Sequence, residues 1–377
     1  MAENSSSKLR GTGEIEPGDS AWWRIHAVRD ETPNRPLADL AGAARQLLGD
    51  PKKRGEWTTE RYAQYEEQRV LDAWRAQRQA PGGAGLHRPL AIYGADSRED
   101  IRFVTDPNAR TFWEGSMATC LVARAESLTE VAGRPGEDKE YALDTYTLRD
   151  HLEAVYGTPC DDVRFLNQPC CPGGTAVLVA DDVIVTAGHV LWRLGNYDVT
   201  QLRFVFGFEQ LEPNYARTEI PAAWVCSGVQ LIHRPNPLKW EEDWAVIRIT
   251  PPRGSPTRVR YFRRSGGPAV GSTLYVLGHP TGLPMKLASG IVRDSSNPRI
   301  LTTTLDTFAG NSGSPVFSLI AVGGRPALQL EGTLITGEAD DYVTVGSCVK
   351  PNAISESSGE GATVQRVTNY LQHIPGV

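Results

Sequence analysis

Short apolar runs follow one another along most of this chain, and they constrain its fold more than any other feature. From residue 119 onward they cover 119–123, 174–180, 183–186, 202–208, 229–232, 273–277, 301–305, 316–320 and 328–335. Runs of this length, rich in β-branched residues and separated by turns, are typical of β-strands. Many short strands in succession predict paired antiparallel barrels. We therefore expect a mainly β protein with a double antiparallel β-barrel and short helices at 148–155 and 363–373.

The first 88 residues have a different pattern. Apolar residues recur at helical spacing over 37–48 and again over 59–79, and the Gly- and Pro-rich stretch 81–85 then breaks the chain. We place the domain boundary here, with a small N-terminal helical extension at 1–88 and the β domain at 89–377. Two helices are too few to predict an independent core. We therefore expect the extension to dock as a pro-segment or to act as an interaction module for a protein partner.

A stretch rich in small residues, 307–317, presents a candidate nucleophile. Ser312 stands between Gly310 and Gly313, directly before an apolar run. A nucleophilic hydroxyl needs a sharp turn that exposes its oxygen and leaves backbone N–H groups free for a developing oxyanion. Glycine and serine are also common in ordinary turns, so the motif gains its weight from the motifs that accompany it.

Two such motifs precede Ser312. His189 follows the apolar run at 183–186, and Asp243 stands just before another apolar run at 245–249. The order His189, Asp243, Ser312 and the residues around them resemble the trypsin-like serine proteases of the chymotrypsin fold, which carry Thr-Ala-x-His, Asp-x-Ala and Gly-x-Ser-Gly-x-Pro. The segment 91–98 resembles the start of the mature part of the bacterial glutamyl-endopeptidase-like branch. The resemblance covers residues 92–377 and is most specific at the three motifs.

The resemblance implies a serine endopeptidase that acts on a protein or peptide substrate. Ser312 would attack the scissile carbonyl, His189 would take its proton, and Asp243 would orient the imidazole. The backbone N–H groups of Gly310 and Ser312 would bind the oxyanion. His279, in a Gly-His-Pro loop, is expected to have a structural role.

Specificity is a further implication of the resemblance. Asp306 stands six residues before Ser312, where trypsin-like enzymes place the floor of the primary pocket, and a carboxylate there favours Arg or Lys. Glutamyl endopeptidases instead use a His on the pocket-wall strand, and the corresponding stretch 333–337 has none. The residues expected to contact substrate are Asp306, Thr307, Thr336, Gly337 and Glu338, the last three beside an added substrate strand. A Glu/Asp-specific endopeptidase and a non-catalytic binding module on a protease fold stay open as alternatives.

Control of activity is expected to differ from that of mammalian digestive enzymes. Those enzymes pair an Asp before the nucleophile with a newly cut N-terminus, and here that position is Asn311. The oxyanion hole is therefore expected either to be ready-formed or to be controlled in another way, for which the extension at 1–88 is our candidate.

Charge and cysteine usage limit the partners. A net charge of −6 gives no reason to expect nucleic acid, and no apolar run has the ~18 residues of a membrane span. The N-terminus lacks a secretory signal, which predicts a cytoplasmic protein, or a secreted one if a signal was removed. The spacing of the six cysteines fits no zinc site, so we expect no metal and no other cofactor. Reduced buried cysteines are favoured over a bridge such as Cys160–Cys171.

Overall fold

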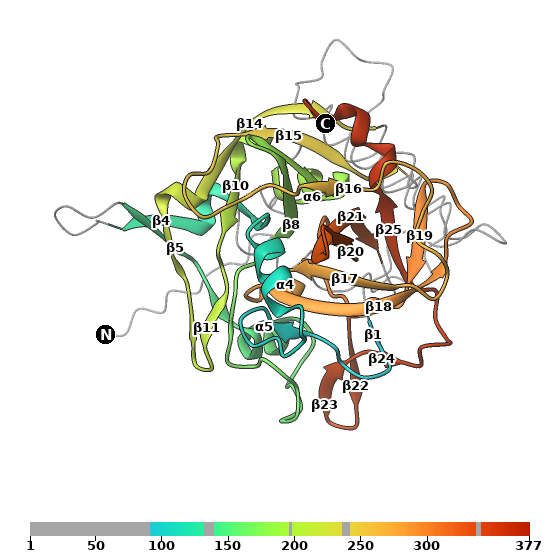
Figure 1. The fold of residues 1–377 in the computed structure, drawn as a ribbon. Helices are drawn as coiled ribbons and strands as arrows, with labels where there is room; N and C mark the ends of the chain where they lie inside the picture. Colours follow the sequence, from blue (N-terminus) through green and yellow to red (C-terminus); the bar gives the residue numbers. More distant parts are fainter. Residues whose placement is uncertain (1–90, 132–138, 196–197, 236–241, 337–340) are drawn as a thin grey trace, which may run out of the picture.

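The computed structural model describes residues 91–131, 139–195, 198–235, 242–336 and 341–377 (Figure 1). The predicted extension at 1–88, with its helices at 37–48 and 59–79, lies outside the described residues. The predicted boundary at residue 88 therefore stays a prediction.

Six antiparallel strands close the first barrel in the order β10, β14, β15, β9, β8, β3. Alternating side chains fill its interior, and all seven residues of β8 are buried because both faces of this strand are covered. The strands are β3 (Thr119–Arg124), β8 (Gly174–Ala180), β9 (Val183–Thr186), β10 (Leu202–Phe206), β14 (Val225–His233) and β15 (Ala245–Ile249).

A second barrel follows in the chain, with strand order β21, β20, β17, β18, β19, β25, and the pairing of β25 with β21 closes it. Its strands are β17 (Thr273–Gly278), β18 (Lys286–Asp294), β19 (Ile300–Thr303), β20 (Pro315–Val322), β21 (Arg325–Thr336) and β25 (Ala362–Arg366). The predicted mainly β double-barrel fold of the chymotrypsin type is confirmed.

Short elements surround the two barrels. The helices are α4 (Ala109–Ser116), α5 (Leu148–Val155) and α6 (Gly188–Gly195). The peripheral strands are β1 (Ile92–Tyr93), β2 (Glu99–Asp100), β4 (Leu128–Val131), β5 (Glu140–Leu143), β6 (Tyr146–Thr147), β7 (Pro169–Cys170), β11 (Gln210–Glu212), β12 (Tyr215–Ala216), β13 (Glu219–Pro221), β16 (Tyr261–Phe262), β22 (Tyr342–Val345), β23 (Cys348–Pro351) and β24 (Ala353–Ile354). No helix in the described part of the chain has the length and apolarity that a membrane span needs.

Most expected strands and the expected helix at 148–155 are present, and among the barrel strands the differences lie in the second barrel. The helix predicted at 363–373 is wrong, because residues 362–366 form β25 and only short 3₁₀ turns follow. Closure of the barrel decides this, since β19 and β21 both pair with the segment. Strand β18 was not predicted, because Ser289 and Gly290 interrupt its apolar alternation.

One disulfide joins Cys160, between α5 and β7, to Cys348 in β23, with a Cα–Cα distance of 5.0 Å. The alternative bridge Cys160–Cys171 is wrong, because Cys171 is a free, buried thiol, as are Cys120, Cys170 and Cys226. Four of the six cysteines therefore follow the expectation of reduced, buried residues.

Candidate active site

The three predicted catalytic residues come from different elements and meet in space. His189 is the second residue of helix α6, which follows β9, Asp243 precedes β15, and Ser312 precedes β20 in the other barrel. Strands β9 and β15 pair with each other, with Ala245 opposite Thr186, so their ends carry His189 and Asp243 side by side. A Cβ on Gly188 would lie 2.9 Å from the Asp243 carboxylate, so glycine permits this close approach.

Hydrogen bonds link the three side chains in sequence. His189 Nε2 lies 2.7 Å from Ser312 Oγ, and His189 Nδ1 lies 2.6 Å from Asp243 Oδ2. The second carboxylate oxygen accepts a bond of 2.8 Å from the His189 backbone N–H, and Gln365 Oε1 accepts the Asp243 N–H at 3.0 Å. The His189 side chain is only 3% exposed, whereas that of Asp243 is 18% exposed. The imidazole is therefore held on both sides and has one orientation.

The loop before Ser312 has every carbonyl from residue 309 to residue 312 occupied by a donor. Thr281 N donates to Ala309 O, and Ser314 N donates to Asn311 O at 2.8 Å. Thr175 supplies the other two donors, with its hydroxyl 2.8 Å from Gly310 O and its N–H 2.9 Å from Ser312 O.

These bonds fix the direction of the two N–H groups predicted to bind an oxyanion. In a trans peptide the N–H points opposite to the preceding carbonyl, so the N–H groups of Gly310 and Ser312 turn away from Thr281 and Ser314. Within the described chain neither N–H donates a hydrogen bond. Gly310 has φ +94°, and a Cβ there would lie 2.4 Å from His279 O, so this turn requires glycine.

Thr175 was not predicted as a functional residue. It is fully buried at the start of β8, and its hydroxyl also accepts the His279 N–H at 3.2 Å while its carbonyl accepts the Thr186 hydroxyl at 2.7 Å. In the sequence it is one residue of an apolar strand, and no local signal distinguishes it. Only the pairing of the strand with the nucleophile loop gives it this position.

The carboxylate of Asp306 is hydrogen-bonded to other parts of the protein, whereas the predicted pocket floor requires a carboxylate that is available to a substrate side chain. Its carboxylate accepts hydrogen bonds from Tyr93 N at 2.7 Å, from Ser97 N at 2.7 Å and from the Ser97 hydroxyl at 2.6 Å. Burial raises the pKa of Asp306 to about 6, although these hydrogen bonds oppose that rise. The arrangement favours an anchoring role for Asp306, which holds the segment 91–98, over a free floor for a cationic side chain.

The anchored segment packs beneath the nucleophile loop. Thr307 N donates to Ala91 O at 3.3 Å, and the Arg98 guanidinium lies 4.0 Å from the Phe308 ring centroid. Arg98 is 1% exposed and forms an ion pair of 2.8 Å with Asp96. The start of the described chain is thus in direct contact with the residues that lead to Ser312.

The other predicted substrate contacts have mixed positions. Thr307 is fully buried, with its hydroxyl 3.3 Å from Leu305 O, and Thr336 is half-buried at the end of β21. Gly337 and Glu338 lie outside the described residues. Asp341, which was not predicted, accepts the Ala309 N–H at 2.9 Å and so adds a further support of the nucleophile loop.

Among the described residues, no group of three His, Cys, Asp or Glu side chains is arranged to hold a metal ion.

Comparison with known families gives one match. Residues 174–321 match the trypsin-like peptidase domain, a range that contains His189, Asp243 and Ser312. No curated protein matches the chain.

Two solved structures are similar at low identity. The serine endoprotease from Yersinia pestis is 13% identical, with a TM-score of 0.39, and the match covers 71% of this chain and 65% of that chain. This chain therefore spans less than two thirds of the length of that endoprotease. A Glu endopeptidase in complex with MPD is 15% identical, with a TM-score of 0.42, and the match covers 75% of this chain and 96% of that chain.

Proposed function

Because the chain carries a trypsin-like peptidase domain on a chymotrypsin-type fold, we propose that it is a serine endopeptidase whose catalytic triad is Ser312, His189 and Asp243. One observation carries the proposal, namely the continuous hydrogen bonding from Ser312 Oγ through both nitrogens of His189 to Asp243. Three residues spread over 123 sequence positions meet in the arrangement that acyl transfer requires.

The geometry supports a two-stage hydrolysis of a peptide bond. His189 Nε2 takes the proton as Ser312 Oγ attacks the scissile carbonyl, and the same nitrogen then returns the proton to the leaving amine. Asp243 accepts the hydrogen bond from Nδ1 throughout, which keeps the correct tautomer and stabilises the imidazolium. Water then attacks the acyl-enzyme with His189 again as the base, and this step releases the second product.

Two backbone N–H groups stabilise the charge that develops on the carbonyl oxygen. Those of Gly310 and Ser312 donate to no group in the described part of the chain and are fixed in direction, and each donor of this kind is worth roughly 3 kcal/mol in the transition state. Because the neighbouring carbonyls are held by Thr175, Thr281 and Ser314, the hole is ready-formed. No rearrangement of the Asn311 side chain is then required, consistent with its burial and its 3.2 Å bond from Ser314 Oγ.

Labelling with a fluorophosphonate probe tests the proposal. We expect the full-length protein to label covalently and Ser312→Ala to lose all labelling and all peptidase activity. Ser357→Ala, a matched change at an exposed serine, should leave both unchanged. A correctly folded protein that neither labels nor cleaves a peptide library would instead indicate the non-catalytic binding module.

Specificity is tested separately, because the predicted preference for Arg or Lys depends on Asp306. A panel of short chromogenic peptides with Arg, Lys, Glu, Asp or Leu before the scissile bond gives the preference directly. If Asp306 is the pocket floor, Asp306→Asn lowers kcat/KM for the Arg and Lys peptides by about 100-fold or more and spares the others. If Asp306 is an anchor of segment 91–98, the same change lowers kcat/KM for all peptides alike.

We also propose that residues 1–88 act on the nucleophile loop. The extension is followed in the chain by the segment 91–98. In this segment Ala91 hydrogen-bonds to Thr307, and Tyr93 hydrogen-bonds to Asp306. A change in the position of the extension would therefore alter the position of residues close to Ser312. An inserted site for a specific protease after residue 88 allows the extension to be cut from the folded full-length protein. Equal peptidase rates and equal partner binding before and after the cut would refute this control.

A further inference from the structure

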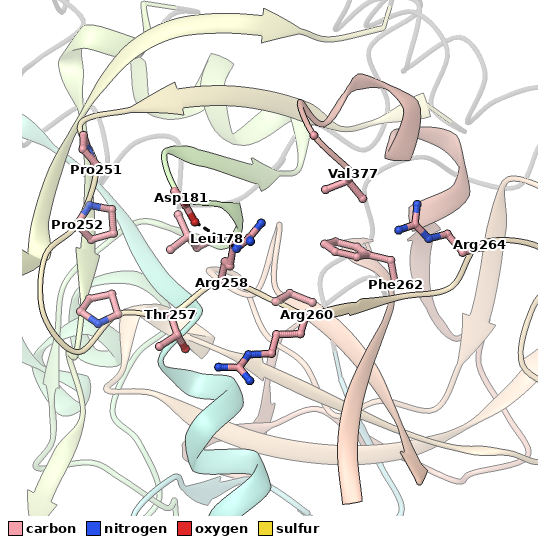
Figure 2. A pocket seen from close by; sticks show the side chains of 13 residues that line it. Leu178, Asp181, Pro251, Pro252, Thr257, Arg258, Arg260, Phe262, Arg264 and Val377 are labelled. Atoms are coloured by element: carbon pink, nitrogen blue, oxygen red, sulfur yellow. Dashed lines mark ion pairs between the residues drawn. The ribbon is translucent and has the colours of Figure 1, made fainter. Parts of the chain in front are cut away.

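An elongated cavity lies on the segment that joins the two barrels, away from the candidate active site. It encloses about 680 Å³ and is lined by Leu178, Asp181, Pro251, Pro252, Pro256, Thr257, Arg258, Val259, Arg260, Phe262, Arg264, Gly376 and Val377. Pro251 and Pro252 lie at one end, and Phe262, Arg264 and Val377 lie at the other (Figure 2). We refer to it as the linker groove.

The linker groove is remote from Ser312. Strand β8 runs from Thr175, which contacts the nucleophile loop, to the turn at Asp181 that borders the groove. Six residues of extended strand span about 20 Å. The groove is therefore a site separate from the triad.

The backbone of the groove is held by both barrels. Thr257 N and Val259 N donate to Met117 O and Leu178 O at 3.1 and 2.9 Å, on the side of the first barrel. On the other side β16 pairs with β21, and Arg263 N donates to Leu330 O at 3.0 Å. Prolines with fixed φ angles add to this rigidity. The groove is thus preformed, which reduces the ordering cost of binding.

The charge of the groove is opposite to that of the whole chain. Three arginines, Arg258, Arg260 and Arg264, and one acidic side chain, Asp181, line the groove, whereas the whole chain carries −6. Arg258 is paired with Asp181 at 3.2 Å, and Figure 2 shows these two side chains facing each other. Arg260 and Arg264 are exposed and form no ion pair within the described chain. Arg260 and Arg264 therefore flank an apolar floor without an ion-pair partner among the described residues.

We propose that the linker groove binds an extended acidic segment of a partner protein. In an extended peptide the side chains at positions i, i+2 and i+4 face the same side, so carboxylates at i and i+4 can pair with Arg260 and Arg264 while an apolar residue at i+2 packs on Phe262. A small anion would use one arginine and leave the apolar floor uncovered. Grooves lined by aromatic side chains, such as that of Phe262 here, also suit extended peptides. The inference does not depend on peptidase activity.

Fluorescence anisotropy with the full-length Ser312→Ala protein tests this inference without cleavage of the probe. The probe is a labelled peptide of about twelve residues in which every second position is in turn acidic (Asp or Glu) and apolar (Leu or Val), with Ser and Pro at the positions between, so that acidic and apolar side chains share one face; at ~3.3 Å per residue it is long enough to cover the groove. We expect saturable binding that weakens when salt is raised from about 0.05 M to about 0.5 M. The same peptide with Asn and Gln in place of the acids should not bind.

Two matched double variants locate the site. Arg260→Gln with Arg264→Gln should weaken binding by about tenfold, since an exposed ion pair contributes about two- to fivefold. Arg253→Gln with Arg325→Gln removes the same charge from exposed arginines outside the groove and should leave binding unchanged. Arg260→Glu with Arg264→Glu should favour a Lys-substituted peptide. Thermal unfolding checks that every variant folds.

Three results would overturn the inference. The first is the absence of saturable binding by the full-length chain. The second is equal binding by the groove variant and its matched control. The third is binding of a single-stranded oligonucleotide as tight as that of the acidic peptide, which would make the segment a non-selective polyanion surface. None of these results bears on the triad, because the binding assay uses a protein without the nucleophile.

Discussion

At the scale of single residues, Thr175 makes several hydrogen bonds to the loop of the candidate nucleophile and to the loop of His279. It donates to Gly310 O and accepts from His279 N, and the backbone of Thr175 donates to Ser312 O. One buried side chain from the first barrel thus positions the loop of the second barrel that carries the nucleophile. We infer that Thr175 is a positioning residue and does not touch the substrate.

Thr175→Val tests this role because valine keeps the shape and removes the hydroxyl. We expect kcat to fall about tenfold with little change in KM, since a loosened Gly310 carbonyl lets the oxyanion donors drift. Thr175→Ser should recover most of the rate. The measurement is steady-state kinetics with one peptide substrate, together with inhibition by a peptide aldehyde that mimics the tetrahedral intermediate.

A matched control separates positioning from general stability. Thr303, on β19, is also fully buried, and its hydroxyl donates to Ala362 O at 3.0 Å instead of to a carbonyl of residues 309–312. Thr303→Val should lower the free energy of unfolding by about 1–3 kcal/mol and leave kcat near its original value. An equal loss of kcat in both variants would contradict a specific role for Thr175.

The sequence predicts residues whose chemistry depends on local context and misses those that depend on tertiary contact. Ser312, His189 and Asp243 each have a recognisable neighbourhood, so the amino-acid sequence alone is enough to expect that they meet. Asp306 has the right offset from Ser312, yet its environment depends on Tyr93 and Ser97, more than 200 residues away. No local sequence pattern indicates this contact.

At the scale of elements, the turn that follows β17 contains a buried titratable group. His279 is fully buried, its Nδ1 lies 2.9 Å from Leu283 O, and its ring stacks on Phe208 with centroids 5.7 Å apart. Burial lowers the pKa of His279 to about 4. The folded state therefore keeps this imidazole neutral, and the structural role predicted for His279 agrees with its position.

The free energy of unfolding should consequently depend on pH through His279. Its folded pKa lies below the unfolded value of 6.5, so the stabilisation is present above pH 6.5 and is lost as pH falls towards 4. We expect a loss of about 2 kcal/mol between about pH 7.5 and about pH 5. His279→Asn, which retains a donor for Leu283 O, should lack this part of the loss in urea titrations at the two pH values.

Phe208→Leu supplies the control for the His279 experiment. It disturbs the same packing without adding or removing a titratable group, so it should lower stability equally at both pH values. A pH dependence of unfolding that is the same in the wild type and in His279→Asn would contradict a neutral, buried imidazole.

The errors in predicted elements have a common cause. Residues 362–366 carry apolar positions compatible with helical spacing, but barrel closure between β19 and β21 requires a strand there. In β18, Ser289 and Gly290 break the alternation, and a Cβ on Gly290 would lie 2.5 Å from the Thr304 backbone. Partners distant in sequence thus override local propensity in both cases.

At the scale of the whole molecule, a disulfide and backbone pairing join the two halves of the chain. Cys160 lies before the second strand of the first barrel, and Cys348 lies in a hairpin after β21, 188 residues later. Around the bridge, Cys160 N donates to Val349 O at 3.0 Å and Val349 N donates to Thr158 O at 2.9 Å. The sequence gives no means of selecting this pair among six cysteines, because the approach of the two segments is tertiary.

Removal of this bridge should lower the free energy of unfolding, because the unfolded chain then has more conformational freedom. For a loop of this length the chain-entropy estimate is about 5 kcal/mol, and measured losses for native bridges are about 2–5 kcal/mol. We expect Cys160→Ser with Cys348→Ser to lose about 2–4 kcal/mol in urea unfolding. A reductant should lower the stability of the wild type to the same level and leave the double variant unchanged.

Free thiols at both positions in protein isolated from its native cells would support the predicted cytoplasmic location, whereas a joined Cys160–Cys348 peptide in mass spectrometry would favour the secreted alternative.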